Sequence, residues 1–389
     1  MANRRMANLK GLAKGLATDG RRLRWVLAVV AAIAVLAGTV AVARAVQGRY
    51  DVPSADLFGS ATPTPGAGGS DRPPSPTPSP TPEPGAGITG PLNILLVGID
   101  PRVSVPTWRP NADAVLILHV PATMDRAYLF SLPRDLRVDI PAFPPARFGG
   151  ARTKLTHAMS YGSRVPGTSR PSTAQGFQLL ARTVSRYTGI ARFDAGAVLN
   201  FGGFTKLVDA VGGVDLYVDQ RVVSRHRQPD GQHRRPVSGG YTGPQMVYQP
   251  GTRHLTGWQA LDYARQRYLT GGDYTRQRHQ QQLVKALAGE ILDRGLATDP
   301  ARLDAVLRAV GGALTFDGRG RRVIDYAYAL RGVRPAAMTL VALPGASVGR
   351  GGGYLGEELK PVGREFLAAV RANRVPAFMA SHPELVVRR

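Results

Sequence analysis

The stretch NILLVGIDPRVSVPTWRPNADAVLILHVPATMDRAYLFSLPRD, residues 93–135, contains three short apolar runs separated by polar and turn-forming residues. The runs occupy residues 93–99, 114–120 and 127–132. Each has the length and composition of a buried β-strand. In an antiparallel meander, the end of the first strand, the start of the second and the end of the third lie at one edge of the sheet. This arrangement predicts that three charged side chains come together there: Asp100, Asp113 and Arg134.

Helical and strand patterns alternate downstream of these runs. Apolar residues recur at helical spacing in residues 174–187 and 201–211. Strands are predicted at residues 214–218 and 338–343, whereas residues 220–249, rich in Arg, Pro and Gly, are predicted to be irregular. Helices interleaved with strands indicate an α/β domain in which helices cover a mixed central sheet.

Residues 251–292 contain the highest density of candidate functional side chains. Thr256 and Gln259 match a capping box, which predicts a helix that ends near residues 265–268. Asp273 follows a glycine break and predicts the start of a second helix that runs to about residue 293.

One face of this second helix changes from polar to apolar along its length. The face consists of Arg276, Gln280, Leu283 and Leu287. Its apolar end should face the core, so its polar end points inward or into a cleft, where an unpartnered arginine is costly. Two interpretations stay open: an ion pair to Asp262 or Asp273, or a bound anion.

The N-terminal part predicts a membrane anchor and a spacer. WVLAVVAAIAVLAGTVAVA, residues 25–43, is uncharged over 19 residues, which is about 28 Å of helix and close to a hydrocarbon core. Basic residues dominate residues 1–24, so the positive-inside rule places this tail in the cytoplasm and the remainder outside. A cleaved signal peptide is the alternative. Residues 44–90, rich in Pro, Gly, Ser and Thr, predict an unfolded extracellular linker. The folded domain is assigned to residues 91–375, with a C-terminal tail at 376–389.

Composition narrows the class of protein. The chain has 389 residues, no cysteine and a formal net charge of +23. The lack of cysteine excludes disulfides, iron–sulfur clusters and thiol nucleophiles. The seven histidines show no metal-ligand spacing, which argues against zinc. The charge reflects either a bias toward arginine or an anionic partner. Predicted export argues against nucleic acid and favours a membrane surface or a wall above it.

Seven segments, in order, resemble the LytR–CpsA–Psr (LCP) family of cell-wall ligases. They are NILLVGIDPR (93–102), NADAVLILHV (111–120), FSLPRDLRVDIP (130–141), KLTHAMSYG (154–162), GVDLYV (213–218), GTRHLTGWQALDYARQRY (251–268) and GDYTRQRHQQQLVKAL (272–287). The resemblance implies a three-layer fold, a mixed sheet between helices with an apolar channel for a lipid. It also implies a phosphotransferase that takes a glycopolymer from a polyprenyl-pyrophosphate lipid and attaches it to peptidoglycan through a phosphodiester.

The resemblance also implies roles for particular residues. Asp100 and Asp113 match the aspartates that hold Mg²⁺ (or Mn²⁺) on the pyrophosphate. The pyrophosphate clamp corresponds to Arg134, Lys154, Arg265, Arg267, Arg276 and Gln280. The chemistry is consistent with this set, because arginines offer paired donors to phosphate oxygens and Mg²⁺ takes one or two carboxylates. The base that accepts the proton of the acceptor hydroxyl stays open among Asp100, Asp113 and Asp135, and Asp135 has the alternative role of orienting Arg134.

Two positions depart from the family pattern. Asn111 stands where many members have an arginine, and Arg109 is a candidate to replace it. His279 stands in place of a second helical arginine, which predicts a weaker or pH-dependent donor.

Two other functions compete with the ligase. A non-catalytic binder of lipid-linked or wall glycopolymer would use the same arginines without a metal ion. A membrane-bound transcription regulator would need a cytoplasmic domain, which the predicted orientation of the anchor contradicts. The polymer itself is not specified by the sequence.

Overall fold

The computed structural model describes residues 56–59, 85–102, 104–294, 306, 308–321, 325–326, 329–330 and 333–387. The predicted cytoplasmic tail, the predicted membrane helix and most of the predicted linker lie outside these residues. Within the described ranges, no helix is both long enough and apolar enough to cross a membrane.

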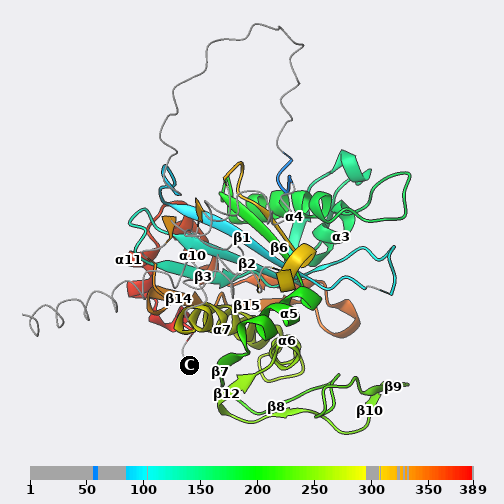
Figure 1. The fold of residues 1–389 in the computed structure, drawn as a ribbon. Helices are drawn as coiled ribbons and strands as arrows, with labels where there is room; N and C mark the ends of the chain where they lie inside the picture. The colour runs from blue at the N-terminus through cyan, green and yellow to red at the C-terminus, as the bar shows by residue number, and fades with distance from the viewer. Residues whose placement is uncertain are drawn as a thin grey trace, which may run out of the picture.

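A six-stranded mixed sheet forms the centre of the domain (Figure 1). Its order is β13 (Leu314–Asp317), β6 (Ala195–Asn200), β1 (Leu92–Ile99), β2 (Ala112–Val120), β3 (Ala127–Ser131) and β14 (Met338–Val341). β1, β2 and β3 pair antiparallel, which confirms the predicted meander. β6 runs parallel to β1 and β14 parallel to β3, whereas β13 runs antiparallel to β6.

Successive side chains of β1 point to opposite faces and enter two separate cores. Ile94 packs in one core and Leu95 in the other. The first core lies under α5 (Phe201–Val211), α6 (Gly257–Arg265) and α7 (Gly272–Asp293). The second lies under α3 (Thr156–Gly162), α4 (Thr173–Thr188), α10 (Pro361–Arg371) and α11 (Val375–Ser381). Helices therefore flank the sheet on both faces, as the alternating pattern predicts.

Local signals set the helix ends nearest to the predicted site. The Asn200 side chain accepts a hydrogen bond from the N–H of Gly203 and caps the start of α5, and Gly212, with a left-handed φ of 94°, caps its end. The capping box of Thr256 and Gln259 is present at the start of α6. These caps fix where α5 and α6 begin beside the edge of the sheet.

Paired strands make up most of the remaining regular structure. The pairs are β4 (Arg137–Ile140) with β5 (Ala151–Lys154), β7 (Val214–Val218) with β12 (Gly251–Leu255), β8 (Val222–Val223) with β11 (Val247–Tyr248), β9 (Arg235–Val237) with β10 (Gly240–Thr242), and β15 (Gly345–Val348) with β16 (Gly356–Leu359). Residues 220–249 are thus short paired strands rather than wholly irregular, because their turns let brief segments pair. They project beside α6 (Figure 1).

Residues 56–59 of the predicted linker pack on the domain. Leu57 is fully buried, and its N–H donates to Oδ2 of Asp317 over 2.8 Å. The Phe58 ring meets that of Phe177 edge-on, with centroids 5.5 Å apart. Residues 56–59 therefore belong to the folded unit, because their apolar pair enters the core beneath α4.

The chain also continues to pack beyond residue 375. α11 buries Met379, and the segment after it buries Leu385. Val386 forms an isolated bridge with Val341 of β14. The folded unit therefore includes residues 376–387, which the sequence assigned to a tail.

Substituting Leu57→Ala in the full chain is expected to lower the free energy of unfolding by about 2 kcal/mol, because it removes a buried side chain and leaves a cavity. Urea denaturation followed by circular dichroism would measure the change. Val237→Ala is the matched control, because Val237 is 47% exposed and should be neutral. Equal denaturation midpoints for both variants would contradict the docking of residues 56–59.

Candidate active site

The ends of the three central strands converge on one pocket. Asp100 directly follows β1, Asp113 is the second residue of β2, and Arg134 comes shortly after β3. Nη1 of Arg134 forms an ion pair with Oδ1 of Asp113. All three residues line a pocket of about 300 Å³. The meander therefore brings together the three charged side chains that the strand pattern places at one edge.

The other wall of the pocket comes from α6, α7 and the residues between them. Arg265 ends α6, and its Nη2 donates to Oδ2 of Asp100 over 2.7 Å. Arg267 follows in the connection, and Arg276 and Gln280 lie one turn apart on α7. All four line the pocket, so two helices complete the site that three strands begin.

Arg276 is largely buried, with 5% of its side chain exposed. Its Nη2 lies 2.7 Å from Oδ1 of Asp273, so one of the two predicted ion pairs is present. The other predicted partner, Asp262, instead accepts hydrogen bonds from Ser224 and Tyr248. Nε of Arg276 is buried without a hydrogen-bond partner. The Arg276 guanidinium at the pocket wall therefore forms an ion pair through Nη2 and keeps an unused hydrogen-bond donor at Nε.

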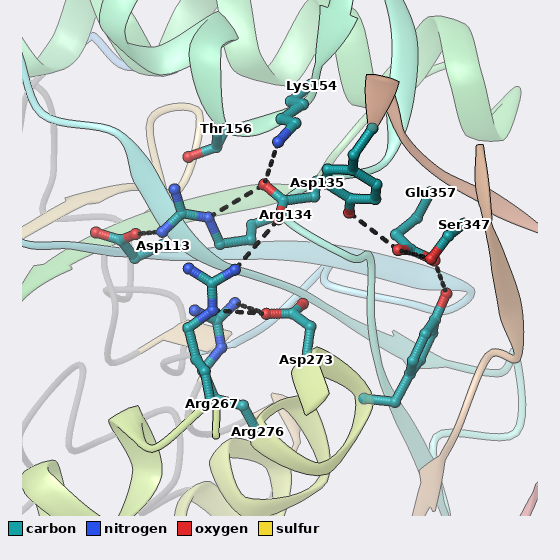
Figure 2. A network of polar contacts seen from close by, with 12 residues as sticks. Asp113, Arg134, Asp135, Lys154, Thr156, Arg267, Asp273, Arg276, Ser347 and Glu357 are labelled. Carbon is teal, nitrogen blue, oxygen red and sulfur yellow. Dashed lines mark hydrogen bonds and ion pairs between the residues drawn. The ribbon is translucent and has the colours of Figure 1, made fainter. Parts of the chain in front are cut away.

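Asp135 is a buried acceptor behind the pocket, with 9% of its side chain exposed. Its carboxylate lies 3.6 Å from Nε of Arg134, 3.9 Å from Nζ of Lys154 and 3.3 Å from Nη2 of Arg267 (Figure 2). The Lys154 ammonium also lies 4.4 Å from the ring centroid of Tyr354. Neither Asp135 nor Lys154 is among the residues that line the pocket. Asp135 thus orients cations, which matches the alternative role that its position after Arg134 suggests.

Positive charge exceeds negative charge on the pocket wall. The charged residues that line it are Arg102, Arg134, Arg265, Arg267, Arg276, Asp100 and Asp113. Burial raises the pKa of Asp113, and the nearby guanidiniums of Arg134 and Arg276 oppose this shift. Burial lowers the pKa of Arg276, against the attraction of Asp273. An anionic ligand would relieve the repulsion among these arginines.

An apolar cavity adjoins this polar pocket on the face of the sheet covered by α5, α6 and α7. Its walls are mostly aliphatic, and examples are Leu96, Leu116, Leu199, Leu283 and Leu287. Phe201, Arg265 and Gln280 belong to the walls of both spaces. A ligand with an anionic head and an apolar chain could therefore lie across the junction.

The two pocket carboxylates fit a hard divalent cation. Asp100 uses Oδ2 for Arg265 and Asp113 uses Oδ1 for Arg134, which leaves the second oxygen of each for another cation. Among the described residues, no group of three or more His, Asp or Glu side chains is placed to hold a metal ion. Mg²⁺ commonly takes only one or two carboxylates and completes its shell with water and phosphate oxygens. The pair therefore suits Mg²⁺ bound together with a phosphate ligand.

Four residues of the pocket wall were missed by sequence reasoning. They are Arg102, Trp108, Phe201 and His226. The Arg102 guanidinium lies 3.9 Å from the centroid of Trp108, and both belong to the loop between Asp100 and Asp113. The position of this loop between two candidate site residues was a usable signal. His226 follows β8 in residues 220–249, where no periodicity or motif marked it.

The two departures from the family pattern have different outcomes. Asn111 lines the pocket, whereas the exposed Arg109 does not, and Arg102 supplies a guanidinium there. His279 is fully buried, and its Nε2 lies 3.0 Å from Oδ1 of Asp219, outside the pocket wall. The expectation that His279 acts as a weakened clamp donor is therefore wrong, because its side chain extends from α7 toward Asp219.

The fold and the site define a class of protein: an α/β domain in which an arginine-rich, carboxylate-containing anion pocket meets an apolar cavity. The LytR_cpsA_psr family model matches residues 76–360, and the chain belongs to this family.

Similar proteins have names from cell-wall biosynthesis. The cell wall biosynthesis protein LcpA of Corynebacterium glutamicum is 27% identical over 275 residues, which cover 69% of this chain and 48% of LcpA. The polyisoprenyl-teichoic acid–peptidoglycan teichoic acid transferase TagU of Halalkalibacterium halodurans is 28% identical over 254 residues, 64% of this chain and 69% of TagU. The chain thus spans about half the length of LcpA.

Solved structures share the fold. Bacillus subtilis TagV superposes with a TM-score of 0.52 at 19% identity, covering 74% of this chain and 98% of TagV. TagT bound to LI-WTA superposes with a TM-score of 0.51 at 22% identity, covering 72% of this chain and 90% of TagT. At these identities the likeness establishes the mixed sheet and its flanking helices.

Proposed function

We propose that the protein is a membrane-anchored, extracellular phosphotransferase that moves a glycopolymer from a polyprenyl-pyrophosphate carrier to peptidoglycan. The observation that carries this proposal is the junction of the two spaces at Phe201, Arg265 and Gln280. The arginine pocket suits the diphosphate, and the apolar cavity suits the first part of the prenyl chain. The transferase name of TagU and the wall-biosynthesis name of LcpA support the reaction class.

The reaction is a displacement at phosphorus. A peptidoglycan hydroxyl attacks the phosphorus that carries the glycopolymer, the bond from that phosphorus to the bridging oxygen breaks, and the prenyl phosphate leaves. Negative charge grows on the leaving phosphate, so catalysis consists mainly of positioning and charge neutralisation. Arg134, Arg265 and Arg276 supply the donors. Asp135 and Asp273 hold the guanidiniums in place through the ion pairs described above.

Mg²⁺ or Mn²⁺ held by Asp100 and Asp113 would supply further positive charge for the diphosphate. Removing the metal ion with a chelator is expected to abolish transfer, and added Mg²⁺ should restore it. The same treatment should leave the unfolding midpoint almost unchanged, because the two carboxylates already have arginine partners.

The proposal is tested with the full chain in detergent, a labelled polyprenyl-pyrophosphate disaccharide, peptidoglycan and Mg²⁺. The expected products are wall-bound label and an equal amount of free prenyl phosphate. Donor binding without either product, unchanged in Asp100→Ala and Asp113→Ala, would instead support the non-catalytic binder. A reporter fused to the C-terminus should be active only outside the cytoplasm, and cytoplasmic activity would contradict the extracellular assignment.

A further inference from the structure

The wall of the polar pocket contains one imidazole, that of His226. It is half-buried, and its ring meets that of Tyr241 edge-on with centroids 5.0 Å apart. No hydrogen bond or ion pair from this protein engages its ring nitrogens among the described residues, whereas Asp100 and Asp113 are paired with arginines. The imidazole is therefore the uncommitted basic group of the wall.

The backbone of His226 is held firmly from both sides. Its N–H donates to Oγ of Ser224 over 3.2 Å, and that hydroxyl donates to the buried Asp262 of α6 over 2.9 Å. Its carbonyl accepts from the N–H of Arg234 over 2.8 Å. Within the part of the chain that the structure describes, the largely buried Arg234 guanidinium donates only to backbone carbonyls, those of Arg225, Tyr241 and Gly243. These bonds join residues 220–249 to α6 and hold the backbone of His226 beside the pocket wall.

The position of His226 suits contact with the acceptor hydroxyl rather than with the prenyl chain of the donor. Phe201, Arg265 and Gln280 line both the polar pocket and the apolar cavity, whereas His226 lines the polar pocket alone. An in-line displacement places the nucleophile on the side of the phosphorus away from the leaving prenyl phosphate. The acceptor hydroxyl must therefore approach through the part of the pocket that does not adjoin the cavity.

We propose that the His226 imidazole is the general base that takes the proton from the peptidoglycan hydroxyl as its oxygen attacks phosphorus. This inference rests on the proposed function. The hydroxyl oxygen forms the new bond to phosphorus, the bond to the bridging oxygen breaks with its electron pair on the prenyl phosphate, and the proton goes to a free ring nitrogen of His226. The sequence left this role open among three aspartates, each of which the structure places in an ion pair with arginine.

The charged surroundings favour the neutral, proton-accepting form of this imidazole. Burial lowers the pKa of His226 below its usual range, and the positive charges of Arg265 and Arg225 and the nearby His233 add to this effect. Asp262 opposes it. A lowered pKa means that the base is active above that pKa and is lost as the pH falls through it. The transfer rate should therefore fall on acidification, with an inflection below about pH 6.5.

The test is the pH dependence of transfer by the full chain and by His226→Gln, with the same disaccharide donor, peptidoglycan and Mg²⁺. The variant is expected to lose about 100-fold in kcat at pH 7.5, a typical contribution of a positioned base, with little change in donor KM. The acidic limb of the variant's pH–rate profile should move to lower pH, where only carboxylates titrate. His226→Ala with added imidazole should regain part of the rate, which a merely structural role would not produce.

His233→Gln is the matched control, because this exposed histidine lies in the same segment, residues 220–249, but outside the pocket wall. It should retain the wild-type rate at pH 7.5, and its acidic limb should move at most slightly to higher pH, because His233 contributes less than burial, Arg265 or Arg225 to the lowered pKa of His226. An unchanged rate and acidic limb in His226→Gln would overturn the base assignment while leaving the transferase intact. Absence of transfer by the unmodified protein would instead count against the proposed function itself.

Discussion

Arg134→Ala is expected to lower the rate of glycopolymer transfer by about 10³-fold at saturating donor, which is the lower end of the effect of an arginine that stabilises phosphoryl transfer. Its guanidinium lines the pocket and pairs with Asp113, one of the two carboxylates proposed to hold Mg²⁺. Removing it takes away a planar donor for phosphate oxygens and leaves Asp113 without its nearest cation. The measurement is release of labelled prenyl phosphate by the full chain with Mg²⁺ and peptidoglycan.

Two further variants separate loss of geometry from loss of charge. Arg134→Lys keeps the positive charge but loses the paired donors, so its rate should lie between those of the wild type and Arg134→Ala. Arg152→Ala is the matched control, because Arg152 is 54% exposed and pairs with Asp139 across β4 and β5, away from the pocket wall. Turnover by Arg134→Ala equal to that of Arg152→Ala would remove Arg134 from the clamp.

The fold could be predicted wherever one local pattern determined an element. The apolar runs that contain Ile94, Leu118 and Leu129 became neighbouring antiparallel strands, because strands that are consecutive in the sequence usually pair with each other in a sheet. The capping box at Thr256 set the start of α6 for an equally local reason. The docking of residues 56–59 was not foreseeable in this way, because Phe58 packs on Phe177 of α4 and the N–H of Leu57 donates to Asp317, and both partners are distant in the sequence.

The site was predictable to the extent that its residues lie at the ends of such elements. Asp100 and Asp113 follow from the meander, and Arg276 follows from the periodicity of α7. Lys154 matched a family position but lies behind the wall, because Asp135 and the Tyr354 ring hold its ammonium there. His226 could not be foreseen, because the strand pairs that present it are too short to give a periodic signal.

Arg276→Ala is expected to lower both stability and transfer, because this arginine has a core role and a pocket role. Removing one member of a buried ion pair typically costs about 3–5 kcal/mol. Here the cost should lie toward the lower end of that range, because the Asp273 carboxylate, 13% exposed, loses the guanidinium 2.7 Å away but keeps Arg267, whose Nε lies 3.7 Å from Oδ1. Transfer should fall by about 10³-fold, as for the other clamp arginine. Urea denaturation and the prenyl phosphate assay measure the two effects on the same preparation.

A paired substitution distinguishes the two roles. Arg276→Met combined with Asp273→Asn removes both charges while retaining much of the side-chain volume, and replacing a whole buried ion pair is often neutral for stability. Asn keeps an oxygen that can accept the hydrogen bond from Nε2 of Gln277, which lies 3.1 Å from Oδ2 of Asp273. This double variant should recover most of the unfolding free energy lost in Arg276→Ala, yet remain inactive, because the pocket still lacks its buried guanidinium. Recovery of transfer together with stability would mean that Arg276 serves the core alone and that the diphosphate is held by the other arginines of the wall.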